Sequence, residues 1–354
     1  MILKKIKINK ITLQNRIVVG PMCQYSANNG KPSKWHFNHL KKLSKLGAGL
    51  LMIESTAVSK SARISNKDLQ LSNASQQASF FKLLKHLKKN NNIAIGIQIS
   101  HAGRKGSAKI PWIKSNSPLR KKDGSWQTYA PSEIKRDLNW PKPEALTKTN
   151  LELIIKDFKS TTIRAKKIGF DCLEIHMGHG YLLHQFISSI SNKRTDKFGG
   201  SLKNRCKYPL EIFKQVRKIW PKNRILGVRI TGSDHLKNGI KVNDSIYLAK
   251  QLKNLKADYV AVTSGGILPK TGMRVHLGHR VNLAKKIRKK TKIRVIALGM
   301  MNSVKLINRV FSKKEADLVA VSRRFVNEPY WLIKEYIKSE KKHHLLPEQY
   351  LRCF

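Results

Sequence analysis

Two histidines and a tyrosine lie close together at residues 176–181, which read His-Met-Gly-His-Gly-Tyr. An apolar run precedes this stretch, so we expect a buried strand that ends in a turn. In one turn the imidazoles of His176 and His179 can both point at a single oxygen atom, although each could instead be a hydrogen-bonded core residue. An unperturbed phenol has a pKa of about 10, so Tyr181 is protonated at neutral pH and can act as a general acid.

Polar, glycine and sulfur-containing residues also follow or interrupt other apolar runs. They are Gly20, Pro21, Met22, Cys23 and Tyr25, then Ser55, Gln98 and Arg229, then Ser264–Gly266, and finally Gly299, Ser322 and Arg323. A polar group inside an apolar segment is costly unless it has a partner. Their repeated position at the ends of the runs predicts one site at one pole of the fold. Arg229 could instead belong to a buried ion pair, and Cys23 could be a small buried hydrophobic residue.

The elements that must position these residues alternate along the chain. We predict strands at Ile17–Val19, Leu50–Ile53, Ile93–Ile99, Cys172–Ile175, Ile225–Ile230, Tyr259–Thr263, Val295–Leu298 and Leu318–Val321. We predict helices at His36–Leu46, Gln76–Lys89, Asn150–Lys167, Pro209–Ile219, Asn243–Asn254, Arg280–Lys289, Val304–Phe311 and Pro329–Ile337. Apolar runs without alternation are typical of a parallel sheet covered on both faces. This α/β pattern favours a single (β/α)8 TIM barrel over a doubly wound sheet.

In such a barrel the chemistry belongs at the C-terminal ends of the strands. Gly299, Ser322 and Arg323 then match the usual phosphate site of the last two loops, with an ordinary turn as the alternative. The segment 103–148 is too long for a plain loop, so we expect a capping excursion after the third strand. We expect residues 1–354 to form one domain. The remaining histidines that we single out as structural are His36, His39, His101 and His184.

The charge of the chain is extreme. Its 354 residues include 71 Lys and Arg against 21 Asp and Glu, which gives a formal net charge of +50. Such a charge attracts nucleic acid, anionic membranes or phosphorylated substrates. The lysines are nevertheless scattered along the whole chain among many Asn and Ile residues. This pattern favours a compositional bias, and we expect no specific nucleic-acid partner.

The sequence also bears on location and metals. It has no run of about 18 uncharged apolar residues and no apolar core behind its basic start, so we expect no membrane span and no secretory signal. The cysteines at positions 23, 172, 206 and 353 lie far apart and include no CxxC motif. That spacing fits neither a zinc site nor a cysteine-ligated iron–sulfur cluster. We expect a cytoplasmic protein without a metal.

Three segments resemble the Old Yellow Enzyme family of FMN-dependent ene-reductases, in particular its bacterial xenobiotic-reductase branch. The most specific segment is 175–205, which contains the histidine pair, Tyr181 and a Gly-Gly-Ser motif. Residues 21–26, Pro-Met-Cys-Gln-Tyr-Ser, resemble the first flavin loop of that branch, in which a cysteine replaces the threonine of other branches. Residues 98–105 resemble its third-strand motif.

The resemblance implies noncovalent FMN, with NADPH or NADH as the reductant. The residues that it implies for FMN are Gly20, Pro21, Met22, Cys23, Ser55, Gln98, Arg229, Gly299, Ser322 and Arg323. It also implies that His176 and His179, assisted by Tyr25, hold the carbonyl of a small α,β-unsaturated carbonyl or nitro substrate. Hydride would move from flavin N5 to the β-carbon, and Tyr181 would protonate the α-carbon. Asn192, Arg194, Asp196 and Arg205 would fix the loop after the fourth strand.

The tail at 350–352, Tyr-Leu-Arg, resembles the end of this branch, in which an arginine reaches the neighbouring subunit's site. The resemblance thus implies a homodimer or a dimer-based homo-oligomer, with Arg352 as a substrate-binding residue. Three positions depart from the family pattern. Gly20 replaces alanine or a small polar residue, Ser55 replaces alanine, and Ser322 replaces glycine.

Two alternative functions remain open. A tRNA-dihydrouridine synthase is also an FMN barrel, and it would account for the charge. That class has a helical RNA-binding domain after the barrel and a cysteine in the third βα region, whereas no cysteine lies between Cys23 and Cys172 here. The other alternative is a non-catalytic flavin- or nucleic-acid-binding descendant, which predicts loss of Tyr181 or of a histidine.

Overall fold

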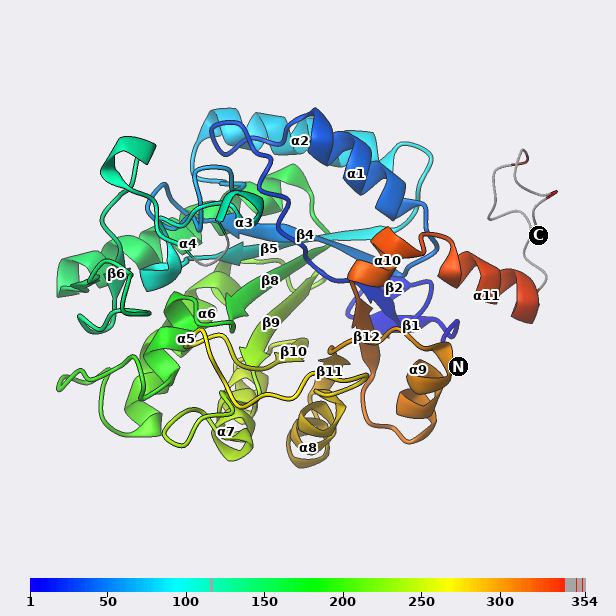
Figure 1. Ribbon diagram of the computed structural model, residues 1–354. Helices are drawn as coiled ribbons and strands as arrows, with labels where there is room; N and C mark the ends of the chain where they lie inside the picture. Colours follow the sequence, from blue (N-terminus) through cyan, green and yellow to red (C-terminus); the bar gives the residue numbers. More distant parts are fainter. Residues whose placement is uncertain (115–116, 341–347, 349–351, 353–354) are drawn as a thin grey trace.

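The computed structural model describes residues 1–114, 117–340, 348 and 352, and its centre is a closed barrel of eight parallel strands (Figure 1). The strands are β3 (Ile17–Val19), β4 (Leu50–Ala57), β5 (Ala94–Ser100), β8 (Cys172–Met177), β9 (Ile225–Thr231), β10 (Tyr259–Thr263), β11 (Arg294–Ala297) and β12 (Leu318–Val321). Almost every residue in them is buried, because one face fills the barrel and the other packs on helices. Each predicted strand is present, and the predicted (β/α)8 TIM barrel is confirmed.

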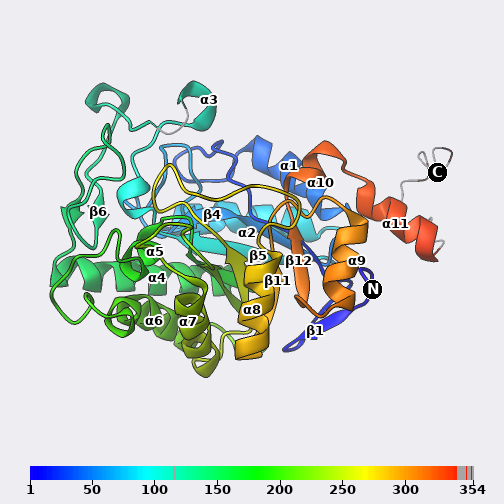
Figure 2. The ribbon, with the colours of Figure 1, turned by 60° about the horizontal axis from the view of Figure 1, so that its bottom comes forward.

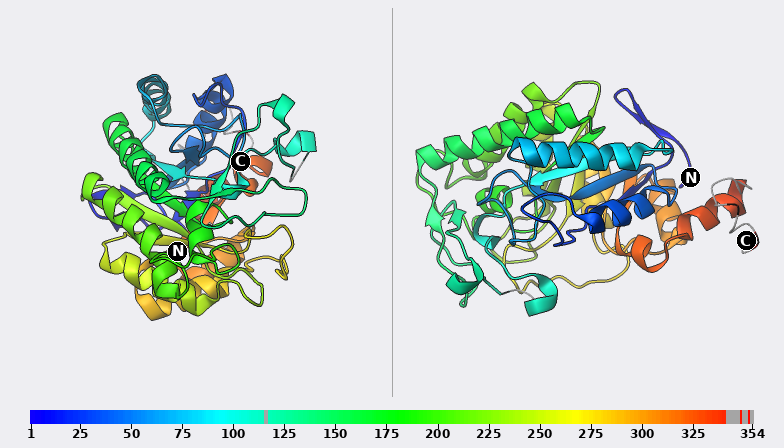
Figure 3. Two further views of the ribbon diagram at one scale, coloured as in Figure 1. Left: turned by 90° about the vertical axis from the view of Figure 1, so that its left-hand side faces the viewer. Right: turned by 90° about the horizontal axis from the view of Figure 1, so that it is seen from above.

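Helices form the outer layer (Figure 2). They are α1 (Lys34–Ser44), α2 (Ala74–Lys88), α4 (Lys148–Ile168), α6 (Leu202–Ile219), α7 (Val242–Asn254), α8 (Val281–Thr291), α9 (Val304–Ser312) and α11 (Trp331–Glu340). Figure 3 shows α1, α2 and α4 lying side by side over β4 and β5. The predicted start of one helix at Pro209 is wrong. Helix α6 begins at Leu202, because the Ser201 side chain accepts a hydrogen bond from the Asn204 backbone, and Pro209 lies inside the helix.

A short antiparallel hairpin, β1 (Ile6–Ile8) and β2 (Ile11–Leu13), closes the N-terminal end of the barrel. Ile8 and Leu13 are 1% and 0% exposed, and they pack against residues at the starts of the barrel strands, such as Leu50 and Tyr259. The sequence pattern does not predict this hairpin, because each of its strands has only three residues. The hairpin leaves the opposite end of the barrel as the open one.

The segment 103–148 joins β5 to α4 and lies at the end of the barrel away from the hairpin (Figure 2). It contains η1 (Gly103–Lys105), α3 (Pro111–Lys114), η2 (Lys121–Asp123), β6 (Tyr129–Ala130) and β7 (Glu144–Ala145). The buried guanidinium of Arg104 donates hydrogen bonds to the carbonyls of Ile134 and Lys135, and to that of Ile267 after β10. One arginine therefore joins the excursion to the rim of the barrel.

Two short helices complete the fold. Helix α5 (Leu182–Ile187) follows the turn after β8, and α10 (Arg323–Asn327) follows β12. Both begin at the C-terminal end of the barrel, beside the predicted site. Among the described residues, none of the helices combines the length and the apolarity needed to cross a membrane.

We expect Leu13→Ala to lower the free energy of unfolding by about 2–5 kcal/mol, because it leaves a cavity in the cluster that closes the barrel. FMN binding should not change, since the site lies at the other end. Denaturant unfolding followed by circular dichroism measures the effect, and Thr12→Ala, an exposed position in the same strand, is the control. Equal stability of the two variants would show that the hairpin does not support the barrel.

Candidate active site

The turn between β8 and α5 brings together the three residues first singled out. His176 Nε2 lies 3.1 Å from His179 Nδ1. The rings of His176 and Tyr181 meet edge to face, with 4.9 Å between their centroids. His179 has a φ of +55°, in the left-handed region, which turns its side chain back toward His176. The predicted proximity of these side chains is therefore present in the structure.

Hydrogen bonds around the two imidazoles restrict their tautomers. The Gly178 backbone N–H donates to His176 Nδ1, so neutral His176 carries its hydrogen on Nε2, facing His179. The Thr263 hydroxyl lies 2.6 Å from His179 Nε2. Both His176 and His179 have pKa values well below the usual range, through burial first and then the charge of Arg229. Both rings are therefore neutral at pH 7.

In the structure the 3.1 Å contact is a hydrogen bond that His176 Nε2 donates to His179 Nδ1, so the neutral His179 ring carries its hydrogen on Nε2, toward Thr263. An oxygen atom bound by both nitrogens would instead require the hydrogen of His179 on Nδ1, and that tautomer makes His179 Nε2 a hydrogen-bond acceptor. The Thr263 hydroxyl can donate that bond. Thr263, at the end of β10, is thus a positioning residue that sequence reasoning missed.

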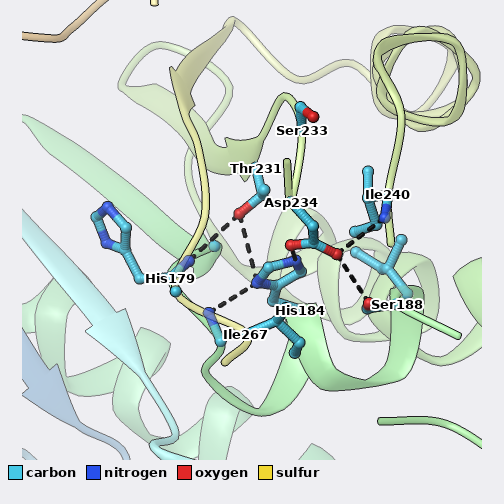
Figure 4. A network of polar contacts seen from close by, with 12 residues as sticks. His179, His184, Ser188, Thr231, Ser233, Asp234, Ile240 and Ile267 are labelled. Carbon is cyan, nitrogen blue, oxygen red and sulfur yellow. Dashed lines mark hydrogen bonds and ion pairs between the residues drawn. The ribbon is translucent and has the colours of Figure 1, made fainter. Parts of the chain in front are cut away.

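A buried network behind the turn fixes its backbone (Figure 4). His184 Nδ1 accepts the Gly180 N–H at 2.7 Å, and His184 Nε2 lies 3.0 Å from Asp234 Oδ1. The other Asp234 oxygen accepts from the Ser188 hydroxyl and the Ile240 N–H, each at 2.8 Å. Burial by itself would raise the pKa of Asp234, but these partners hold it below the usual range. His184, predicted to be structural, connects the Gly180 backbone to Asp234 in this network.

Lys105 and Gly180 complete the support of the turn. Lys105 Nζ donates to the His179 carbonyl at 2.7 Å and lies 5.0 Å from the centre of the Tyr181 ring. Burial, with Arg136 and Arg104 nearby, lowers the pKa of Lys105 to about 7. Gly180 has a φ of +74°, and a Cβ there would lie 2.0 Å from the Gly266 carbonyl oxygen. Only glycine fits this close approach.

The loop after β3 lies against the same turn. Glu54 Oε1 accepts the Gln24 N–H at 3.0 Å, and Glu54 Oε2 lies 3.5 Å from His36 Nε2. Cys23, Tyr25 and Tyr181 pack on one small apolar cluster. Burial raises the pKa of the Cys23 thiol and of the Tyr181 phenol well above their usual values. The phenol is therefore a protonated donor at neutral pH.

Gln98 and Arg229 lie deeper in the barrel. In the strand register, Gln98 on β5 lies beside Glu174 on β8, and Arg229 on β9 lies beside His176. Gln98 Nε2 donates to Glu174 Oε1 at 2.6 Å. The Arg229 side chain is 9% exposed, and its buried Nε has no hydrogen-bond partner among the described residues. Ser55, at the end of β4, shares a hydrogen bond of 2.5 Å with the Ser100 hydroxyl.

The last two strands end in a cluster of positive charge. Ser322 caps α10, and Arg323, its first residue, is exposed. Arg280 donates to the Ser264 hydroxyl at 2.8 Å. Burial, followed by the charges of Arg229 and Arg323, lowers the pKa of Arg280 to about 10. The charges of Arg229 and Arg323 therefore both act on Arg280, a residue that the sequence did not suggest for this end of the barrel.

Two departures from the family pattern meet in this region. A Cβ on Gly20 would lie 2.5 Å from the Ser322 hydroxyl oxygen. Gly20, which lacks the small side chain of the family pattern, thus faces Ser322, which has a side chain where the family pattern has glycine. Gly299 follows β11 with a φ of +114°, a conformation that favours glycine.

Other predicted residues lie outside this assembly. Asn192, Arg194 and Arg205 donate to backbone carbonyls of α5, of the segment after it and of the excursion, as expected for residues that fix a loop. Arg352 is exposed, and the residues on either side of it, including Tyr350 and Leu351, are outside the described part of the chain. The described residues contain no cluster suited to a metal ion.

Comparisons with known proteins agree with this geometry. The model of the NADH:flavin oxidoreductase / NADH oxidase family matches residues 2–342. An NADPH dehydrogenase of Clostridium acetobutylicum is 34% identical over 328 residues, which are 92% of this chain and 91% of that protein. The structure of the old yellow enzyme homologue from Zymomonas mobilis is similar, with a TM-score of 0.80 at 20% identity, covering 96% of this chain and 93% of that one. A 2-naphthoyl-CoA reductase complex has a TM-score of 0.85 at 22% identity; the match covers 95% of this chain, which spans 52% of that longer one.

The barrel, the site and these matches define an FMN-dependent oxidoreductase that takes NAD(P)H as reductant and acts on small molecules. The chain belongs to the NADH:flavin oxidoreductase / NADH oxidase family, which is the Old Yellow Enzyme family of ene-reductases. The resemblance drawn from its motifs is confirmed.

The residues at the open end also fit FMN on physical grounds. The buried Arg229 Nε, which has no partner among the described residues, suits an acceptor on the electron-rich pyrimidine side of the isoalloxazine. The cluster of Arg280 and Arg323 suits the phosphate, at the place where TIM barrels commonly bind one.

We expect Thr263→Val to weaken binding of a phenol to the oxidised holoenzyme, because His179 Nε2 loses the donor that keeps its hydrogen on Nδ1. One neutral hydrogen bond contributes about 0.5–1.5 kcal/mol, so the dissociation constant should rise about 2–12-fold. Titration followed in the flavin absorption spectrum measures it. Thr263→Ser, which keeps the hydroxyl, should bind like the wild type; wild-type affinity in the valine variant would remove Thr263 from the site.

Proposed function

We propose that the protein reduces the activated C=C bond of small α,β-unsaturated carbonyl or nitro compounds at the open end of the barrel. The observation that carries the proposal is the pair of neutral imidazoles, with His176 Nε2 and His179 Nδ1 3.1 Å apart, beside the Tyr181 phenol. A substrate oxygen would replace the contact between the two nitrogens and accept a hydrogen bond from each, with the hydrogen of His179 moved to Nδ1. The phenol beside them would supply the proton that reduction of a polarised C=C bond requires.

FMN is held by residues from several strand ends. The proposed set is Gly20, Pro21, Met22, Cys23, Ser55, Gln98, Arg229, Gly299, Ser322 and Arg323, with Arg280 added from the geometry. When bound there, FMN would supply hydride chemistry to the substrate β-carbon, with NADPH or NADH as the source. Arg229 would hold the pyrimidine side, Arg323 and Arg280 would bind the phosphate, and the Cys23 thiol would be placed to tune the reactive edge.

His176 and His179 bind the substrate oxygen, where negative charge develops as hydride arrives. Losing one such donor typically costs about 10²–10³ in rate. Because both imidazoles have lowered pKa values, they stabilise the charge by hydrogen bonding and remain neutral. Tyr25, packed beside Cys23, assists in holding the substrate.

Tyr181 donates the proton to the α-carbon. Its raised pKa keeps the phenol protonated until the carbanion forms. The phenolate left behind would be stabilised by the positive charge of Arg136, which opposes part of the rise in the Tyr181 pKa, and Lys105 Nζ lies 5.0 Å from the ring centre. A proton from solvent then restores the Tyr181 phenol.

Assembly and location are also proposed from the sequence. The tail at 350–352 supports a homodimer or dimer-based oligomer in which Arg352 contributes to the neighbouring substrate site. A cytoplasmic location is consistent with the need for NAD(P)H and with free thiols at Cys23, Cys172 and Cys206.

The two alternative functions are less well supported. The family match favours an ene-reductase over a tRNA-dihydrouridine synthase, and both histidines and Tyr181 are present.

Tyr181→Phe separates the two half-reactions. We expect NADPH reduction of the flavin to stay near the wild-type rate, because hydride transfer to FMN needs no such proton donor. Reduction of an enone should slow by about 10²–10⁴, the usual range for a general acid. A nitroalkene should be affected less, since a nitro-stabilised carbanion can wait for a solvent proton.

Rapid-mixing measurements of both half-reactions decide the role of Tyr181. Tyr25→Phe, which removes the neighbouring phenol hydroxyl, is the matched control and should slow proton donation far less. Equal slowing of both half-reactions in Tyr181→Phe would mean that Tyr181 is a packing residue.

Arg323→Ala should weaken FMN binding, because a hydrogen bond to a charged group contributes about 1.5–3 kcal/mol, or roughly tenfold to a hundredfold in affinity. Arg324→Ala is the control, since Arg324 is paired with Glu328 at 3.1 Å. Reconstitution of the apoprotein followed by flavin fluorescence gives both affinities. The opposite ranking would move the phosphate contact to Arg324.

A further inference from the structure

A buried carboxylate lies directly below the proposed site. Glu174 is two residues before His176 on β8, so both side chains point into the barrel. Its side chain is 2% exposed. Gln98 Nε2 donates to one carboxylate oxygen at 2.6 Å, and the Tyr259 hydroxyl lies 2.9 Å from the other. Donors at both oxygens match a carboxylate, which only accepts.

The strands are shaped to make this arrangement. Gln98, Glu174, Gly227 and Tyr259 stand at one level on four consecutive strands. The Tyr259 ring crosses β9 to reach Glu174, and it can do so because position 227 is glycine: a Cβ there would lie 2.0 Å from the ring. The hydroxyl of Tyr259 also lies 3.6 Å from the Cys172 sulfur. Several residues on separate strands therefore serve one carboxylate.

Stability does not explain the carboxylate. The rest of the lower barrel is apolar, with Met52, Ala261 and Leu318 in its cluster. Burial raises the pKa of Glu174, which means that its charged form is disfavoured there. The charge that acts on it most strongly is that of Arg229, on the adjacent strand and one level nearer the rim. Replacing a whole buried polar cluster by well-packed apolar residues is often neutral or stabilising, although removing Glu174 alone would leave its partners without an acceptor.

We propose that Glu174 sets the reduction potential of the bound flavin by opposing the charge of Arg229 and by orienting the Gln98 amide. The inference rests on the proposed placement of the flavin against Arg229 and Gln98. Two-electron reduction adds negative charge to the pyrimidine side of FMN, which Arg229 favours and Glu174 disfavours in a medium of low dielectric constant. Glu174 thereby keeps the reduced cofactor a strong hydride donor toward the substrate. It is a positioning and electrostatic residue that acts through two flavin contacts.

Glu174→Gln tests this role, since it removes the charge and preserves the shape. We expect the midpoint potential of the holoenzyme to become more positive, as the ratio of affinities for reduced and oxidised FMN rises about tenfold. For a two-electron couple that ratio corresponds to about 30 mV. The half-reactions should split in opposite directions: faster flavin reduction by NADPH and slower hydride transfer to the substrate. A merely structural residue would slow both or neither.

Cys172→Ala is the matched control, because it alters the same cluster without a change of charge, and its potential should equal that of the wild type. If Glu174→Gln does not fold, the double variant E174M/Y259F replaces the carboxylate and its hydroxyl partner together, which leaves no unsatisfied group between them. It should show the same positive shift. The potential is measured by reductive titration without substrate, so a wrong substrate class leaves the test intact. An unchanged or more negative potential in both Glu174 variants would overturn the role of Glu174.

Discussion

A buried turn must have a hydrogen-bond partner for each backbone polar group, and the two central residues of the turn after β8, His179 and Gly180, meet this requirement through side chains of other elements. The His179 N–H and carbonyl bond to Thr231 and Lys105, at 3.3 and 2.7 Å. The Gly180 N–H and carbonyl bond to His184 and Gln185, each at 2.7 Å. Strand β9, helix α5 and the start of the excursion therefore determine where the two imidazoles and the phenol lie. The positions of the two imidazoles thus depend on several elements at the C-terminal end of the barrel, and not on the turn alone.

Two histidine–carboxylate pairs hold the two main loops, in opposite arrangements. At the loop after β3, Glu54 accepts the backbone N–H and His36 stands behind it. At the turn after β8, His184 accepts the N–H and Asp234 stands behind it. Between these two pairs, charged and neutral side chains occupy different parts of the open end. In the proposed arrangement the cofactor half would contain Arg229, Arg280 and Arg323, whereas the substrate half would present neutral imidazoles and phenols. Neutral hydrogen-bond donors can stabilise negative charge that develops on the substrate, and they attract anions from solution less strongly than cationic side chains would.

The sequence was a good guide wherever residue type and rim position coincide. The apolar runs locate all the barrel strands, and the motif around His176 predicts the proximity of two imidazoles and a phenol that the structure contains. It was a poor guide where a role depends on which strand lies next to which. Nothing in the sequence distinguishes Thr263 from other threonines, because only the closed barrel places it beside His179. The sequence likewise predicts Arg280 only as the first residue of a helix, and the structure adds that the charge of Arg323 acts on it. Glu174 stands inside an apolar run, and only the register of four strands explains why it is tolerated there.

The contact between Gly20 and Ser322 has a consequence for how the site can change over time. The two residues share a volume that holds one small side chain, here that of Ser322 between β12 and α10, because a Cβ on Gly20 would lie 2.5 Å from the serine hydroxyl oxygen. A lineage that acquires alanine at the first position must first give up, or turn aside, the hydroxyl at the second. Glycine at both positions leaves this volume empty and is therefore one intermediate through which either arrangement can reach the other; rotation of the serine hydroxyl is another route.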